Sequence, residues 1–182
     1  MRSISFLLLA ASLASCNDNT HTELPTTEAP LVKDSAGQTL EEYRKPFITS
    51  YRFDSFKATV YKGKLLAPTK GDNELIRDSA FMSPLRKACG DSGINFAGHY
   101  TVVQSGCGAM CSGLYIIDRI TGQIYADLPP NNGGRWGFLY KPDSRMLISN
   151  ANALDDSLKT YMGEFDAPEI YEWTGTSLKQ LQ

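Results

Sequence analysis

The sequence has no surplus of positive charge and very little histidine. Its 182 residues include 18 lysines and arginines, 20 acidic residues and two histidines, for a formal net charge of −2 at pH 7. Nucleic-acid-binding proteins carry a basic patch that faces the phosphates, and no basic stripe with interleaved aromatic residues occurs here. The glycine patterns of a P-loop or a dinucleotide-binding fold are also absent. The composition therefore excludes nucleic acid as an expected partner and predicts no nucleotide site.

Long hydrophobic runs are also lacking, apart from one at the start of the chain. Residues 4–13 are mostly apolar, follow a single basic residue, Arg2, and precede several small residues. This run is too short to cross a bilayer, which needs about 20 apolar residues. Its three-part layout is that of a secretory signal peptide, which is removed from the mature protein. Removal of the segment leaves 17 basic against 20 acidic residues, a formal charge of −3.

The signal segment ends in the letters LASC, residues 13–16. This ending resembles the lipobox of bacterial lipoproteins, in which the cysteine thiol receives a diacylglyceryl group and becomes the new amino terminus. The resemblance implies that residues 1–15 are removed and that Cys16 carries acyl chains that hold the protein on a membrane. Asn17 in place of aspartate implies an outer-membrane anchor, facing the periplasm or the surface, rather than an inner-membrane one. An ordinary secreted protein cleaved near Ala14 is the alternative.

Composition divides the mature chain into a tether and one domain. Residues 16–46 are rich in Thr, Glu, Pro and Ser without a sustained apolar period, which is typical of a flexible tether, with a short helix starting at 40–43. Residues 47–182 are long enough for a single globular domain with its own core.

Short runs of β-branched and aromatic residues, separated by turn residues, predict that this domain is mainly β. The expected strands lie at 56–67, as one long strand or a pair, and at 99–104, 114–118, 123–128, 137–140, 145–149, 169–173 and 177–181. Because neighbouring strands follow one another closely, we expect an antiparallel meander, curled or partly barrel-like. A helix is predicted at 83–89, with Ser83 as its cap, Pro84 in its first position and Gly90 at its end, and a helical turn at 72–76. The fold class is therefore mainly β (α+β) with one or two short helices.

Residues 94–118, INFAGHYTVVQSGCGAMCSGLYIID, contain the only histidine of the domain and two of its cysteines. The order of NFAGHY, a strand, GCG, a cysteine and a second strand ending near an Asp resembles a motif of an uncharacterised family of bacterial secreted proteins and lipoproteins. The resemblance extends weakly through 142–149 and 170–173 to the carboxyl end. It implies a shared fold unit and transfers no activity and no catalytic residue.

Three cysteines remain once Cys16 is lipidated, in a compartment where disulfides persist. We predict a bridge between Cys107 and Cys111, because the glycines around Cys107 and a short loop at 108–110 can bring two strands back together. A bridge from Cys89 to either partner is the alternative. Chain-entropy estimates of about 2 kcal/mol for the first bridge and about 3 kcal/mol for the second are too close to decide.

His99 admits two catalytic interpretations and one structural one. With Cys89, Cys107 and Cys111 it would complete a Cys3His zinc site, although oxidation of the thiols competes with metal binding. Alternatively, His99 would be the base that activates a Cys107 nucleophile. We favour the third interpretation, a partly buried ring satisfied by the backbone, which leaves the domain without a predicted metal or cofactor.

The absence of a convincing catalytic set favours a non-enzymatic envelope lipoprotein that binds or modulates a protein or glycan partner. Inhibition of a host lysozyme is one version of this function. The alternative is a thiol- or zinc-dependent periplasmic hydrolase centred on His99 and Cys107, and a structural spacer is a third class. Aromatic residues in strands more often pair across a sheet than line a ligand groove. A weak hint of such a groove nevertheless comes from Trp136, Tyr140, Tyr161 and Trp173.

Overall fold

The computed structural model describes residues 39–69, 78–108, 111–130 and 135–182. The chain divides into two units, Met1–Val32 and Lys33–Gln182, and every described residue belongs to the second. The signal segment, the tether up to residue 38 and the helical turn expected at 72–76 lie outside the described residues. No helix in the described part is both long and apolar enough to cross a membrane.

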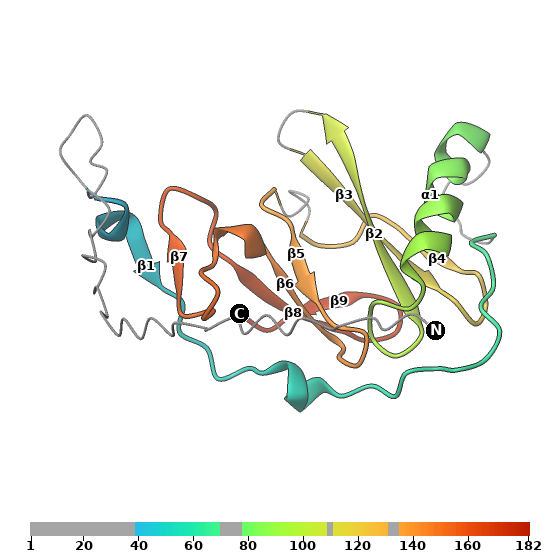
Figure 1. Cartoon of the computed structure of the whole chain (residues 1–182), viewed down its shortest axis with the longest axis horizontal. Helices are drawn as coiled ribbons and strands as arrows, with labels where there is room; N and C mark the ends of the chain where they lie inside the picture. The colour runs from blue at the N-terminus through green and yellow to red at the C-terminus, as the bar shows by residue number, and fades with distance from the viewer. Residues whose placement is uncertain (1–38, 70–77, 109–110, 131–134) are drawn as a thin grey trace, which may run out of the picture. The chain divides into compact units, whose positions relative to one another are not determined.

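Nine strands and one α-helix occur in the described part, so the domain is mainly β, as the sequence predicts (Figure 1). The strands are β1 (Arg44–Pro46), β2 (Tyr100–Gly108), β3 (Cys111–Asp118), β4 (Ile124–Tyr125), β5 (Phe138–Tyr140), β6 (Met146–Ser149), β7 (Thr160–Met162), β8 (Glu169–Trp173) and β9 (Leu178–Gln180). The helix is α1 (Ser79–Ser92), and short 3₁₀ helices span Leu40–Tyr43, Phe53–Phe56 and Ala151–Ala153.

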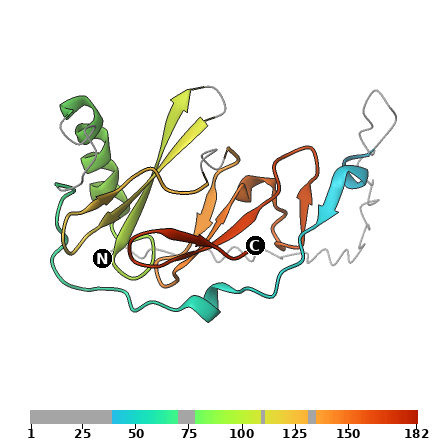
Figure 2. The ribbon, with the colours of Figure 1, turned by 180° about the vertical axis from the view of Figure 1, so that it is seen from behind.

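The expected antiparallel pairing is confirmed, and the described strands are divided among three sheets. Their strand orders are β2-β3-β4, β5-β6-β8-β9 and β1-β7, and none of them closes into a barrel over the residues described. In the view from behind, the β8–β9 hairpin lies in front of the rest of its sheet (Figure 2). This hairpin forms one edge of the four-stranded sheet.

The three-stranded and four-stranded sheets share one apolar core. Val102 of β2 is paired with Ile116 of β3, and both belong to the same buried cluster as Leu147 and Trp173 of the other sheet. The outer face of each sheet is also covered. Ile117 and Ile124 pack against Met82, Leu85 and Cys89 of α1, whereas Met146, Ile148 and Ile170 pack against Phe47 and Phe53. Each such side chain contributes roughly 1.5–3 kcal/mol when fully buried, so layered packing is the main source of stability.

The helix runs alongside β2 (Figure 1) and is longer than predicted. It begins at Ser79, capped by the Asp78 side chain, which accepts a hydrogen bond of 2.8 Å from the backbone N–H of Ala80. The predicted start at Ser83 is therefore wrong, and Pro84 lies inside the helix. Its missing N–H removes one backbone hydrogen bond. Burial of an apolar face that spans more than two turns offsets this loss, and the helix continues past Gly90 to Ser92.

Residues 47–69 form an extended segment, which we call the strap, and this segment corrects the strands predicted at 56–67. The strap crosses the turns at the ends of both large sheets instead of running beside one strand (Figure 2). Its backbone bonds reach the turn before β6, where Ala58 N–H donates to Asp143 O over 2.8 Å, and the turn before β2, where Tyr61 N–H donates to Gly98 O over 2.8 Å. A ladder needs a partner strand. The turn before β6 supplies one isolated bridge, between Lys57 and Ser144, and no strand extends from it along the strap.

Two glycines allow the strap to approach these turns closely. Gly98 has φ +87°, and a Cβ added there would lie 2.6 Å from the carbonyl oxygen of Thr59. Gly122 has φ +78°, and its Cβ would lie 2.7 Å from the carbonyl oxygen of Ala67. Both positions need a residue that tolerates positive φ and has no side chain.

The short β1–β7 sheet is formed by two segments that the sequence did not predict to be strands. The 3₁₀ helix at 40–43 is confirmed, and β1 follows it on residues that composition assigned to the end of the tether. Lys45 of β1 pairs with Tyr161 of β7, a three-residue strand for which the sequence has no apolar run. The ladder forms because the tertiary structure brings the two segments together, and neither segment predicts it alone.

Arg119, at the turn after β3, is a buried cation that joins the strap, α1 and β2. It is only 5% exposed, and its side chain donates three hydrogen bonds to uncharged oxygens. These acceptors are Leu66 O of the strap at 2.9 Å, Cys89 O of α1 at 2.6 Å and Thr101 Oγ1 of β2 at 2.9 Å. A buried charge costs several kcal/mol unless it is fully hydrogen-bonded, so these three bonds determine whether the arrangement is stable.

We predict that Arg119→Met lowers the free energy of unfolding by roughly 2–4 kcal/mol, because buried acceptors on α1 and β2 would lose their donor. Urea denaturation followed by circular dichroism measures the change. The matched control is Arg86→Met, at an exposed position of α1, which should change stability by no more than about 0.5 kcal/mol. Equal effects of the two substitutions would contradict the role assigned to Arg119.

Candidate functional site

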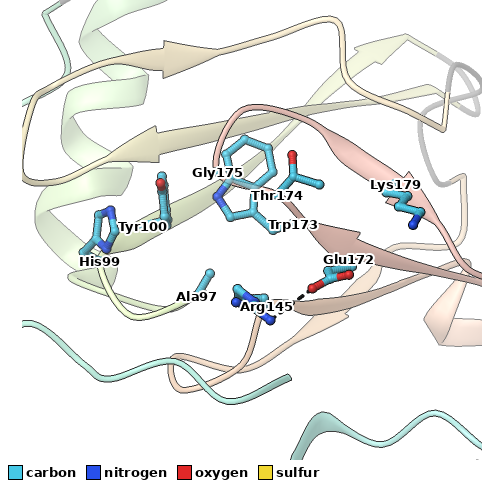
Figure 3. Close-up of a pocket in the computed structure, with 9 residues that line it drawn as sticks. All are labelled: Ala97, His99, Tyr100, Arg145, Glu172, Trp173, Thr174, Gly175 and Lys179. Carbon is cyan, nitrogen blue, oxygen red and sulfur yellow. Dashed lines mark hydrogen bonds and ion pairs between the residues drawn. The ribbon is translucent and has the colours of Figure 1, made fainter. Parts of the chain in front are cut away.

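A pocket of about 410 Å³ opens where the turn before β2 meets the β8–β9 hairpin (Figure 3). Its lining comes from three parts of the chain that are distant in sequence. The lining residues are Ala97, His99, Tyr100, Arg145, Glu172, Trp173, Thr174, Gly175 and Lys179. In Figure 3, His99 and Lys179 lie at opposite ends of the site, with the ion pair of Arg145 and Glu172 between them.

Backbone hydrogen bonds hold the two sides of the pocket together. Ala97 N–H donates to Ser144 O over 3.1 Å, and Gly98 N–H donates to Pro142 O over 2.7 Å. On the other side, Trp173 N–H donates to Arg145 O over 2.8 Å. The turn that carries His99 is thereby docked on the turn that carries Arg145. The pocket is a preformed feature of the fold, as small-molecule sites usually are.

The β8–β9 hairpin supplies the opposite wall, and its turn is defined by local polar contacts. Thr174 Oγ1 donates to Ser177 O over 3.0 Å and accepts from Ser177 N–H over 3.2 Å, while Gly175 has φ +102°. The register that follows places Glu172 directly across from Lys179. These two side chains therefore share a sheet face and can interact electrostatically.

One side of the pocket is charged. Arg145 Nη2 lies 3.0 Å from Glu172 Oε1, and the side chains are 47% and 25% exposed, so solvent screens this pair in part. Lys179 on the edge strand β9 is exposed. Two cations and one carboxylate in the lining leave an excess of positive charge.

The other side is a cluster of aromatic rings. His99 stacks on Tyr100 with 4.1 Å between ring centroids and 32° between planes. Tyr100 in turn meets Trp173 edge to face at 5.3 Å, and Tyr125 meets Trp173 edge to face at 5.2 Å. His99 is the more accessible ring, with its side chain 31% exposed, whereas Trp173 is only 1% exposed.

The indole N–H of Trp173 is buried and has no hydrogen-bond partner among the described residues. Burial raises the pKa of Tyr100, and the nearby Trp173 N–H lowers it in part, which places the two polar groups close together. They nevertheless do not reach hydrogen-bond geometry. The N–H has no exposed surface, so it belongs to the packing behind the pocket wall, beside the Tyr100 ring, and does not face a ligand.

Asp118 lies behind His99. Its Oδ1 is 3.9 Å from His99 Nε2 and accepts hydrogen bonds from the backbone N–H groups of Ile120 and Thr121, at 2.7 and 3.1 Å. The carbonyl of His99 accepts a bond of 2.9 Å from Arg119 N–H. The backbone of His99 is therefore held by Arg119, while its ring lies near the Asp118 carboxylate without a hydrogen bond to it.

The structure separates His99 from Cys107, which the hydrolase hypothesis combined. His99 immediately precedes β2, and Cys107 lies near the other end of this strand. Eight residues of extended strand span roughly 26 Å, so a Cys107 nucleophile with His99 as its base is wrong, and so is a Cys3His zinc site containing both. No group of three potential metal-ligating side chains forms in the described part of the chain.

The predicted bridge between Cys107 and Cys111 remains a prediction. Both residues lie in the β2–β3 hairpin, where Gly108 pairs with Cys111 after an irregularity in the register, but their side chains lie outside the described part. Cys89 is unpaired and only 1% exposed, on the face of α1 that packs against β3 and β4. The alternative bridges from Cys89 are therefore not formed. Cys89 packs with Ile117, which pairs with Thr101, and six residues of extended strand, roughly 20 Å, separate Thr101 from Cys107.

The sequence identifies two of the residues that line the pocket, His99 and Trp173. It does not identify Arg145, Glu172 or Lys179. The Glu172–Lys179 pair depends on a turn that also includes Ser177, one residue longer than the turn expected at 174–176. No sequence signal connects that pair to His99, because the contact depends on how the sheets stack.

Comparison with known proteins adds no constraint, since no protein-family model, no curated protein and no solved structure matches the chain.

The cysteine arrangement predicts a specific labelling pattern. Trypsin cuts after Lys87 and Arg119, which releases Cys89, Cys107 and Cys111 in one peptide. Without reductant we expect no alkylation of this peptide in the native protein, because Cys89 is buried and burial raises the pKa of its thiol. In urea we expect one label, detected by mass spectrometry. Cys89→Ala should remove that label, and three labels without reductant would contradict the Cys107–Cys111 bridge.

Proposed function

We propose that this chain is a lipid-anchored protein of the bacterial cell envelope, most consistent with the outer membrane, and that its β domain is a non-enzymatic binding module. The pocket between His99 and Lys179 is its ligand site. The anchor is supported by the signal segment and the lipobox-like LASC ending at Cys16. A tether after the anchor would let the domain reach partners away from the lipid surface.

The observation that carries the binding function is the charged cluster of Arg145, Glu172 and Lys179 beside the accessible ring of His99. It belongs to a pocket whose walls are held by backbone bonds before any ligand arrives. Preorganised polar groups in a concave site are the usual features of specific recognition. The lining combines donors on Arg145 and Lys179 with an acceptor on Glu172, which suits a polar partner molecule.

Binding is a better proposal than thiol or zinc hydrolysis. The hydrolase hypothesis required His99 and Cys107 to meet, and β2 separates them. The proposed partner is an envelope component with polar groups that fit the pocket, either a glycan or a segment of a protein.

The anchor is tested by Cys16→Ser. We expect the wild-type protein to incorporate a labelled fatty acid and to sediment with the membrane fraction. The Cys16→Ser protein should incorporate none, because only a cysteine thiol accepts the diacylglyceryl group. Fractionation with metabolic labelling measures both properties, and Cys89→Ser serves as the matched control. Persistent labelling of Cys16→Ser would rule out this anchor.

The ligand site is tested by two glutamates, of which only one lines the pocket. Glu172 is part of the lining, whereas Glu164 is exposed and lies outside it. Ligands that bind the native state raise the thermal midpoint. We expect fractionated envelope extracts to raise the midpoint of the wild-type protein and of Glu164→Ala, and to raise that of Glu172→Ala much less. Equal shifts in all three proteins, or no shift in any fraction, would reject the pocket as the site.

A further inference from the structure

The pocket lining also indicates the chemical class of the ligand, on the premise that this pocket is the binding site proposed above. We infer that it binds an acidic saccharide, that is, a sugar carrying a carboxylate. The inference rests on three features of the lining: its excess of cations, its single carboxylate and its accessible aromatic ring.

The cations indicate that the ligand carries negative charge. Arg145 and Lys179 outnumber Glu172 in a chain whose formal net charge is −2, so the local charge has the opposite sign to the whole. Arg145 reaches Glu172 through Nη2, and a guanidinium has further donors that can meet a ligand carboxylate. Charge-assisted hydrogen bonds of this kind are roughly twice as strong as neutral ones. A negative group on the ligand is therefore the best match.

The carboxylate of Glu172 indicates that the ligand also carries hydroxyl groups. A simple anion would be repelled by Glu172, which lies beside Arg145 in the same wall. A hydroxyl can donate to Glu172 and accept from Arg145 or Lys179. A lining that combines one strong acceptor with several donors therefore fits a polyhydroxylated molecule with one acidic group.

Shape and apolar surface favour a sugar ring over a small anion. The pocket volume of about 410 Å³ is far larger than an acetate or phosphate ion requires. His99, stacked on Tyr100 and 31% exposed at its side chain, provides a ring against which the C–H face of a pyranose can pack. The charged wall then faces the ring hydroxyls and the carboxylate. One apolar face and a polar rim are the combination that a pyranose presents.

The test uses the protein as purified from cells, in mild detergent, and matched pairs of saccharides. The probes are tetrasaccharides of galacturonate and of mannuronate, each beside its carboxyl-reduced form, which is the neutral sugar of the same stereochemistry. Titration calorimetry measures affinity. We expect at least one acidic form to bind about tenfold or more tightly than its reduced form, because the reduced form loses its charge-assisted bonds. That affinity should fall as salt is added.

Variants show where the acid binds. Arg145→Met should weaken binding of the acidic tetrasaccharide about tenfold and bring its affinity near that of the reduced form. Lys179→Met should weaken it about threefold, since an exposed rim charge contributes less. Lys64→Met removes an exposed lysine of the strap that does not line the pocket and should change nothing. Arg145 and Lys179 are both exposed, so these proteins should keep the wild-type thermal midpoint.

The outcomes separate this inference from the function it rests on. Equal affinity for acidic and reduced forms would overturn the acidic assignment and leave the binding site in place. Equal binding of acetate or inorganic phosphate would indicate a simple anion site, and equal binding of a glutamate tetrapeptide would indicate a site for acidic peptides. Either result would overturn the assignment of the ligand as a saccharide. Binding of no saccharide, in a protein whose midpoint still responds to envelope extract through Glu172, would refute the inference alone.

Discussion

The rest of the structure depends on one buried guanidinium group. Arg119 donates hydrogen bonds to the strap, to α1 and to β2, three segments that share no strand ladder with one another. Removing a cation from water costs several kcal/mol, and this cost is recovered only where every donor direction meets an acceptor. The arrangement is therefore stable when all three segments are in place and unstable when one of them is displaced. Thr101 strengthens the same junction, because its hydroxyl also donates to the carbonyl of Gly93 just after α1.

The pocket follows from this junction. The backbone N–H of Arg119 holds the carbonyl of His99, and the carboxylate of the neighbouring Asp118 lies 3.9 Å from the histidine ring. The strap then presses against Gly98, where only a glycine fits, and the turn carrying His99 docks on the turn before β6. A histidine at the end of one sheet is thus set opposite an arginine at the end of another. The site is built from turns, but the turns are fixed by buried contacts, and functional groups on loops need such rigid support.

Several elements were predictable because their causes are local. β8 and β9 were expected on either side of a Thr-Gly-Thr turn and are found there, although the turn also includes Ser177 because Trp173 pairs with Leu178. The β2–β3 hairpin and β6 follow from β-branched runs in the same way. The helix start was misplaced because Ser83 and Pro84 imitate a helix beginning, while the apolar face at Met82, Leu85 and Cys89 extends the helix on both sides. Local signals of this kind compete with burial, and burial is the larger effect.

The sequence by itself determined the local elements, which are a β-rich domain and most of its hairpins. The tertiary structure alone decided that the strap crosses turns instead of pairing with a strand, that Cys89 is buried and unpaired, and that β2 keeps Cys107 far from His99. It also decided that His99 faces Arg145, Glu172 and Trp173, residues more than forty positions away in the sequence. The physical reason is that strand and turn propensities act over a few residues, whereas the stacking of two sheets and the burial of Arg119 depend on contacts between distant segments.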